Sequence, residues 1–168
     1  MKSLVAALCL LGLGISLSTT ASEWRIASAT AIPGSSAPLA VSLTGDGQTS
    51  AAQIDIVFDE SRLKLPVASG LLVGAGQNGG QCSRILSNRV RVITSFGQNP
   101  LPSATTTLCT LPFTLFANAP RGQALVRGVG QECSSSTGTQ TCTVVNGACW
   151  FRAHCSRPLP ILRLLSNT

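Results

Sequence analysis

The chain is poor in the residues that catalytic and sugar-binding sites need most. Among its 168 residues there are no tyrosines, one histidine and two tryptophans. The single histidine, His154, stands near the C-terminus, so a Ser-His-Asp or Cys-His system would have to be assembled there. A flat polysaccharide platform needs several exposed aromatic side chains, and the chain has few to offer. The composition therefore argues against an enzyme and against an aromatic platform.

Carboxylates are equally scarce, since the chain has only six Asp and Glu residues. Asp55, Asp59 and Glu60 cluster, but Asp59 and Glu60 are adjacent, unlike the separated acid pair of a glycosidase. Asp46 stands alone in a glycine turn, whereas hard cations need several converging oxygen donors. Gly74–Gly79 matches G-x-G-x-x-G without the following helix and acid that a dinucleotide site requires. We expect no catalytic residue, no cofactor and no metal.

The N-terminus carries the only long apolar run. Lys2 supplies a positive start, Leu4–Leu17 is apolar, and Thr19-Thr20-Ala21 offers small residues for cleavage. The run is shorter than the ~20 residues of a membrane-spanning helix. We expect residues 1–21 to be a secretory signal peptide, with no membrane span after cleavage. The mature protein is then secreted, either extracellular or at the cell envelope.

The mature chain would carry 11 basic and 6 acidic residues, a net charge of +5. The basic residues are scattered singly, which is typical of a solvated surface and not of a nucleic-acid stripe. We therefore expect no nucleic-acid partner. About 147 residues remain, enough for one domain with a hydrophobic core.

Short alternating runs between turn residues predict an all-β fold. In Ala52–Phe58, the even-numbered residues share an apolar face. In Asn88–Thr94, Val90 and Val92 face inward, and Arg89, Arg91 and Ile93 lie opposite. Eight or nine such runs predict a two-sheet jelly-roll or immunoglobulin-like sandwich of about nine strands. The other predicted strands are Trp24–Thr30, Leu39–Leu43, Gly70–Val73, Leu108–Phe116, Gln123–Val129 and Thr139–Val145.

A polar turn follows the strand that ends at Phe58. Asp59 can accept backbone N–H bonds within this turn, and Leu63 can drop into the core below it. We expect Asp59, Ser61 and Leu63 to have a structural role that needs no ligand.

The order of these motifs resembles a bacterial cohesin-like domain, in the β-sandwich superfamily that includes cellulose-binding modules. The resemblance spans roughly residues 24–146 and implies a nine-stranded jelly roll that works by binding. In true cohesins the partner is a dockerin. The motifs are Pro33-Gly34 before Leu39–Leu43, an aromatic-Asp-x-Ser-x-Leu signature at Phe58–Leu63, and Leu108–Phe113 before Ala119-Pro120-Arg121-Gly122.

Six cysteines remain in the mature chain, and export makes disulfides permissible. Six cysteines allow 15 pairings, so any assignment is a hypothesis. A zinc site in the C-terminal region is the alternative, but the spacing lacks C-x-x-C. From their spacing around the predicted strands and loops we expect Cys82–Cys109, Cys133–Cys142 and Cys149–Cys155.

Four residues lie on faces opposite their strands' apolar sides and are candidates for partner binding: Val57, Arg89, Arg91 and Ile93. The alternative is that they simply face solvent. The sequence thus predicts a secreted, non-catalytic domain that binds a protein, either a dockerin-like or an envelope protein, in adhesion or scaffolding. A polysaccharide partner is the alternative.

The C-terminal segment differs from the rest, with arginines among leucine, isoleucine and proline and no acid after Glu132. We expect residues 22–147 to form the domain and residues 148–168 to form a basic, loosely ordered tail. A surface-binding segment and an out-of-frame gene end are the alternatives.

Overall fold

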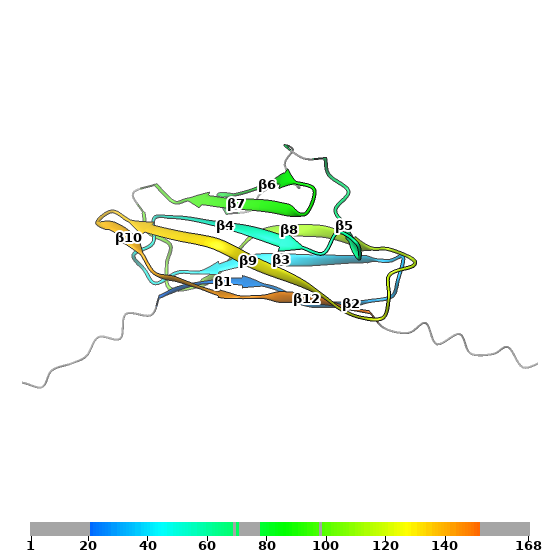
Figure 1. Ribbon diagram of the computed structural model, residues 1–168. Helices are drawn as coiled ribbons and strands as arrows, with labels where there is room; N and C mark the ends of the chain where they lie inside the picture. Colours follow the sequence, from blue (N-terminus) through cyan, green and yellow to red (C-terminus); the bar gives the residue numbers. More distant parts are fainter. Residues whose placement is uncertain (1–20, 69, 71–77, 98, 152–168) are drawn as a thin grey trace, which may run out of the picture.

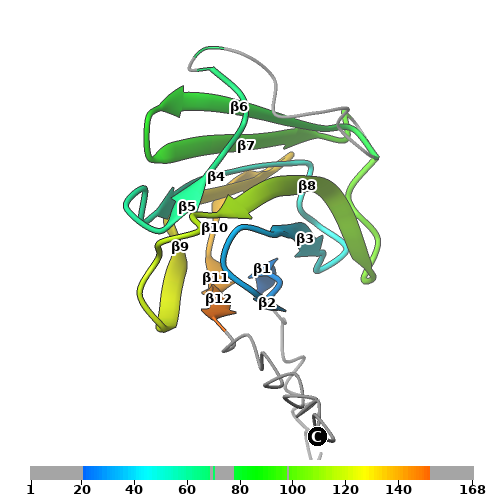
Figure 2. The same ribbon diagram turned by 90° about the vertical axis from the view of Figure 1, so that its right-hand side faces the viewer.

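A computed structural model describes residues 21–68, 70, 78–97 and 99–151. These residues form strands joined by turns and loops, with no helix among them. The strands make two sheets packed face to face, which confirms the all-β sandwich (Figures 1 and 2). Among the described residues, no helix is long and apolar enough to cross a membrane.

The two sheets differ in size, and each is assembled from distant parts of the chain. The first sheet has the order β11 (Cys142–Val145), β1 (Ser22–Ile26), β3 (Ser36–Thr44), β8 (Thr105–Leu115) and β5 (Leu63–Lys64). The second has the order β2 (Ala29–Ala31), β12 (Gly147–Phe151), β9 (Gly122–Ser135), β4 (Ala51–Phe58), β7 (Arg89–Ser95) and β6 (Gly80–Leu86), with β10 (Gly138–Gln140) paired to β9.

The core lies between the sheets and follows the period-2 alternation of the strands. The even-numbered residues of β4, from Ala52 to Phe58, are each at most 5% exposed, and Val90 and Val92 of β7 are fully buried. The rings of Phe58 and Phe113 meet edge to face with centroids 4.8 Å apart, which joins β4 to β8 across the core. The predicted inward faces of β4 and β7 are therefore confirmed.

The first two and the last two strands of the domain each pass from the first sheet to the second, and they do so side by side. β1 pairs with β11 in parallel in the first sheet, and β2 pairs with β12 in parallel in the second. The single strand expected from Trp24 to Thr30 is therefore divided in two. Gly147 lies at the crossing, where a Cβ atom would stand 2.3 Å from the carbonyl oxygen of Ala27. Only glycine fits this close approach of two backbones.

The sandwich continues to Phe151, four residues past the expected domain end at 147. Strand β12 pairs with β9 on one side and β2 on the other. Its inward side chains, Cys149 and Phe151, belong to the core. Residues 148–151 are thus part of the fold because their inner face is buried, while residues 152–168 of the expected tail lie outside the described residues. So do most of the predicted strand Gly70–Val73 and most of the loop Gly74–Gly79.

Two of the three expected disulfides are present, and both join the two sheets. Cys82 of β6 is bonded to Cys109 of β8, with Cα atoms 6.5 Å apart. Cys133 of β9 is bonded to Cys142 of β11, with Cα atoms 5.9 Å apart. The second bond, expected as a clasp within one hairpin, is therefore also a bond between layers. The third pairing stays a prediction, since Cys155 lies outside the described residues.

A candidate binding face on the second sheet

The four candidate residues lie on one surface, the outward side of β9, β4 and β7, called here the outer face. Val57 is directly opposite Arg89 in the β4–β7 register, and Arg91 and Ile93 follow along β7 on the same side. Their strand neighbours Ile56, Val90 and Val92 point into the core, so alternation turns these four side chains outward. Ile93 is 40% exposed, although it is a large apolar side chain.

Strand β9 adds a third column to the outer face. A bulge at Gly130, whose φ is +58°, shifts the register between Gln53 and Asp55. The side chains therefore form three rows across the strands. These rows are Arg127–Val57–Arg89, Val129–Asp55–Arg91 and Glu132–Gln53–Ile93.

The sequence reasoning did not find Arg127 or Glu132. Their strand was predicted to end at Val129, and no local pattern reveals which strands lie side by side. The alternation of Leu125 and Arg127 with the buried Ala124 and Val126 was the available signal that Arg127 faces outward.

An ion pair at the centre of the outer face holds Arg91 in place. The Nε of Arg91 donates to Asp55 Oδ1 at 2.7 Å, and Nη2 donates to Asp55 Oδ2 at 3.0 Å. Arg89 lies farther away, with Nη1 3.7 Å from Asp55 Oδ2. The hydrogen bonds to Asp55 and its negative charge raise the pKa of Arg91 above its ordinary value. Asp55, only 7% exposed, is thus a counter-ion beneath two arginines.

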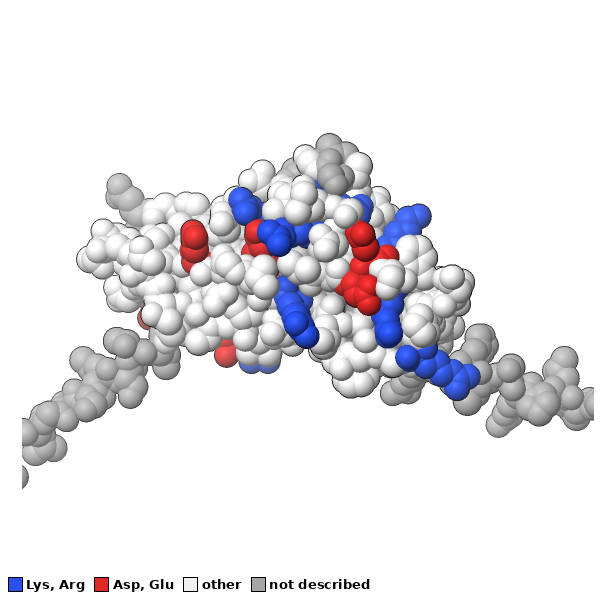
Figure 3. Space-filling model, in the orientation of Figure 1, with Lys and Arg blue, Asp and Glu red and all other residues white. Residues whose placement is uncertain are grey.

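The other end of the outer face is a shallow hollow with little charge. Its volume is about 540 Å³, and among the described residues that line it Glu132 is the only charged one. Figure 3 shows the same division, with charged side chains over the middle and right of this surface and almost none toward β10. The main polar and apolar side chains around the hollow are Gln53, Ile93, Ser95, Ser134 and Thr139.

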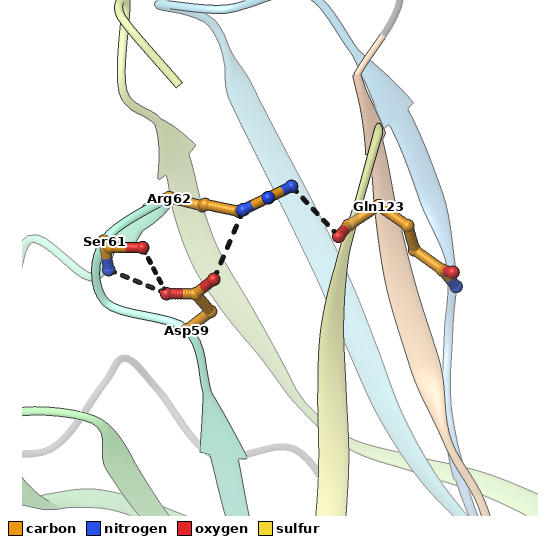
Figure 4. A network of polar contacts seen from close by, with 4 residues as sticks. All are labelled: Asp59, Ser61, Arg62 and Gln123. Carbon is orange, nitrogen blue, oxygen red and sulfur yellow. Dashed lines mark hydrogen bonds and ion pairs between the residues drawn. The ribbon is translucent and has the colours of Figure 1, made fainter. Parts of the chain in front are cut away.

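The turn after β4 is built as the sequence indicates. Asp59 Oδ1 accepts hydrogen bonds from the backbone N–H of Ser61 at 2.9 Å and from its hydroxyl at 2.6 Å (Figure 4). Leu63 is buried below the turn. Arg62 then reaches across, with Nε 3.4 Å from Asp59 Oδ2 and Nη1 donating to the Gln123 carbonyl at 3.2 Å. Its guanidinium also lies over the ring of Phe151. Through Arg62, the turn therefore contacts both β9 and β12.

The three aspartates are committed to structural contacts. Asp46 Oδ1 accepts from the backbone N–H groups of Gln48 and Thr49, each at 2.8 Å, within its own turn. Asp55 is bound to Arg91 and Asp59 to its turn. Within the described ranges, no three His, Cys, Asp or Glu side chains gather as metal ligands would. Nothing in this arrangement resembles a pair of carboxylates poised for acid–base chemistry.

The fold and the outer face define a class: a disulfide-bonded β-sandwich whose second sheet exposes a polar outer surface. The solved structures that it resembles are cohesins, and the chain has a cohesin-like fold. The seventh type I cohesin of ScaB from Pseudobacteroides cellulosolvens superposes with a TM-score of 0.68 at 10% identity, over 83% of this chain and 97% of that chain.

Two further cohesins superpose comparably. The sixth cohesin of scaffoldin B from Acetivibrio cellulolyticus, solved in complex with a Cel5 dockerin mutant, gives a TM-score of 0.63 at 19% identity, over 79% of this chain and 100% of that one. A non-cellulosomal cohesin from the archaeon Archaeoglobus fulgidus gives 0.63 at 14% identity, over 80% and 93%. Neither a protein-family model nor a curated protein sequence matches the chain. At these identities the likeness is one of fold.

Proposed function

We propose that this chain is an exported, non-catalytic domain that binds a protein partner through its outer face, in adhesion or scaffolding at the cell envelope. The observation that carries the proposal is the convergence of Val57, Arg89, Arg91 and Ile93 on that face. Arginine is one of the residue types enriched in protein interfaces and in their hot spots, and Val57 and Ile93 add apolar surface beside it. The pairing of Arg91 with Asp55 reduces the side-chain entropy that binding would otherwise remove.

The fold supports a protein partner. Several of the similar cohesins were solved in complex with dockerins. A dockerin-like domain or another envelope protein is therefore the partner class that we propose. A polysaccharide is less well supported, because Trp150 is the only aromatic among the large apolar side chains exposed in the described part of the chain. A single ring does not make a row on which a sugar chain can stack.

Export is proposed on two grounds. The segment of residues 1–21 has the charge, length and small residues of a signal peptide. The two disulfides also favour an oxidising compartment, since disulfides are rare in reducing ones.

Site-specific photo-cross-linking tests the proposed face. A photoreactive residue would be placed at Ile93 on the outer face or at Thr110, an exposed position of β8 on the opposite sheet. Each purified protein would be mixed with envelope extract and culture medium of the source organism and then irradiated. We expect a defined protein adduct from position 93 and none from position 110. A glycan array run in parallel that shows tight glycan binding, with no protein adduct from position 93, would reverse the proposal.

A further inference from the structure

We infer that the partner of the outer face is acidic, and that it presents two carboxylates on either side of an apolar side chain to the row Arg127–Val57–Arg89. The inference rests on the proposed function, because it names the chemistry of the surface that this same face would bind. The row defines both the charge and the spacing of the partner.

The geometry of the row comes from the register of three strands. Val57 is directly opposite Arg89 on β7 and directly opposite Arg127 on β9, so the three residues lie on one line across the sheet. Neighbouring strands are about 4.8 Å apart, which separates the two arginine Cα atoms by about 10 Å. Val57 is half-buried between them and offers an apolar surface. The row is therefore cation, apolar group, cation.

The positive charge of this row is only partly neutralised within the described part of the domain, because Asp55 lies close to Arg89 but pairs mainly with Arg91. Both carboxylate oxygens of Asp55 accept hydrogen bonds from Arg91. Arg89 is left with one contact of 3.7 Å to Asp55, and its buried Nε atom has no hydrogen-bond partner. Arg127 is exposed and forms no salt bridge with a described residue. Glu132 lies two rows away, opposite Gln53.

This spacing matches a common arrangement of acidic side chains. On a helix, residues seven apart are about 10.5 Å apart along the axis, and residues three or four along lie between them on the same side. A helix with Glu at the first and eighth positions and Leu between would place two carboxylates over Arg127 and Arg89 and an apolar group over Val57. A nucleic-acid backbone fits less well, because Asp55 and Glu132 share the face and no run of basic residues is present.

Three synthetic probes test the inference directly. The first is a helical peptide of about 15 residues with Glu at positions i and i+7 and Leu at i+3 and i+4, spaced by the helix geometry. The second is the same peptide with Lys in place of Glu, and the third is a short duplex DNA. Binding to the isotope-labelled mature chain would be followed by amide shifts in NMR at low and at physiological salt. We expect the Glu peptide to shift the amides of Val57, Arg89 and Arg127, to bind about tenfold more tightly than the Lys peptide, and to weaken with salt.

Matched variants separate a local effect from net charge. Arg127→Glu lies on the row, whereas Lys64→Glu makes the same charge change on β5 of the opposite sheet, and both residues are exposed. We expect Arg127→Glu to weaken the Glu peptide about tenfold and to favour the Lys peptide, while Lys64→Glu changes either affinity less than twofold. Arg89→Gln, which adds no negative charge beside Asp55, should weaken the Glu peptide without unfolding the domain.

Three results would overturn the inference: equal binding of the two peptides, equal effects of the two charge reversals, or tighter binding of the DNA at this row. The photo-cross-linking experiment at position 93 distinguishes a failure of this inference from a failure of the proposed function. If a partner is still captured there by the Arg127→Glu variant with undiminished yield, the face binds a protein whose chemistry is not the acidic one inferred. If the wild-type protein captures none, the proposed function itself fails.

Discussion

The two disulfides allow a quantitative test of what holds the sandwich together. We predict that removing Cys82–Cys109 destabilises the domain more than removing Cys133–Cys142. Both bonds join the two sheets, but the first closes a loop with a sequence separation of 27 residues and the second a loop of 9. A disulfide acts mainly by restricting the unfolded chain, and the restriction increases with loop length.

The loop lengths set the expected magnitudes. The chain-entropy relation for loops of these separations gives about 3.6 kcal/mol for Cys82–Cys109 and about 2.6 kcal/mol for Cys133–Cys142 at 25 °C. The comparison is well matched, because all four cysteines are at most 9% exposed and each double replacement by alanine removes two buried sulfur atoms. Packing losses therefore largely cancel, and a difference of about 1 kcal/mol remains.

Urea unfolding of the two double-alanine variants and the wild-type protein, followed by tryptophan fluorescence, measures these values. Trp24 is fully buried and reports the loss of the core. We also expect steeper dependence on urea in both variants, since an unfolded chain with fewer cross-links exposes more surface. A larger loss for the Cys133–Cys142 variant would refute the reasoning and would mean that strain or residual structure outweighs loop length.

Three further predictions concern single residues. Gly147→Ala should lower the free energy of unfolding by about 1–3 kcal/mol in urea titrations, because the new Cβ meets the Ala27 carbonyl at 2.3 Å. A variant as stable as the wild-type protein would contradict the close approach of the two backbones at Gly147. Partial burial opposes ionisation of Asp46, but its backbone and hydroxyl hydrogen bonds outweigh this effect and lower its pKa below 3.8. Asp46→Ala should therefore lower the free energy of unfolding by about 1 kcal/mol at pH 7, and by progressively less as the pH falls through that lowered pKa. Thermal unfolding at each pH measures this loss. Burial raises the pKa of the Cys149 thiol to about 11. In a Cys155→Ala variant the Cys149 thiol should therefore resist iodoacetamide at neutral pH, and the free energy of unfolding should fall as the pH rises from 9 toward 11. Rapid labelling of the folded variant would show instead that Cys149 is accessible.

The inward and outward faces of individual strands could be read from the sequence because they depend on local geometry alone. Alternation in Ala52–Phe58 and Asn88–Thr94 separates core residues from surface residues, since successive side chains point to opposite sides of a strand. The turn at Asp59 was equally local, because its hydrogen bonds join residues two apart. The candidates on β4 and β7 followed from the same rule.

The neighbours of each strand could not be read in this way. Arg127 joins Val57 and Arg89 only because β9 lies beside β4 in a particular register, which a bulge at Gly130 resets. Residues 148–151 of β12 were assigned to a tail because the strand, Gly147–Phe151, shows no clear polar alternation, and its burial depends on β9 and β2 on either side. The Cys133–Cys142 bond joins the sheets only because β11 crosses to the first sheet.

The sequence by itself determined the all-β class, the inward and outward sides of the main strands, two cysteine pairings and the polar turn after β4. All of these except the Cys82–Cys109 pairing, whose sequence separation is 27, depend on the period of a strand or on residues close in the chain. Only the tertiary structure decided how the ends of the chain close the sandwich and which side chains form rows across β9, β4 and β7. Those features depend on backbone hydrogen bonds between segments as far apart as Val57 and Arg127, for which no local pattern of residues encodes the register.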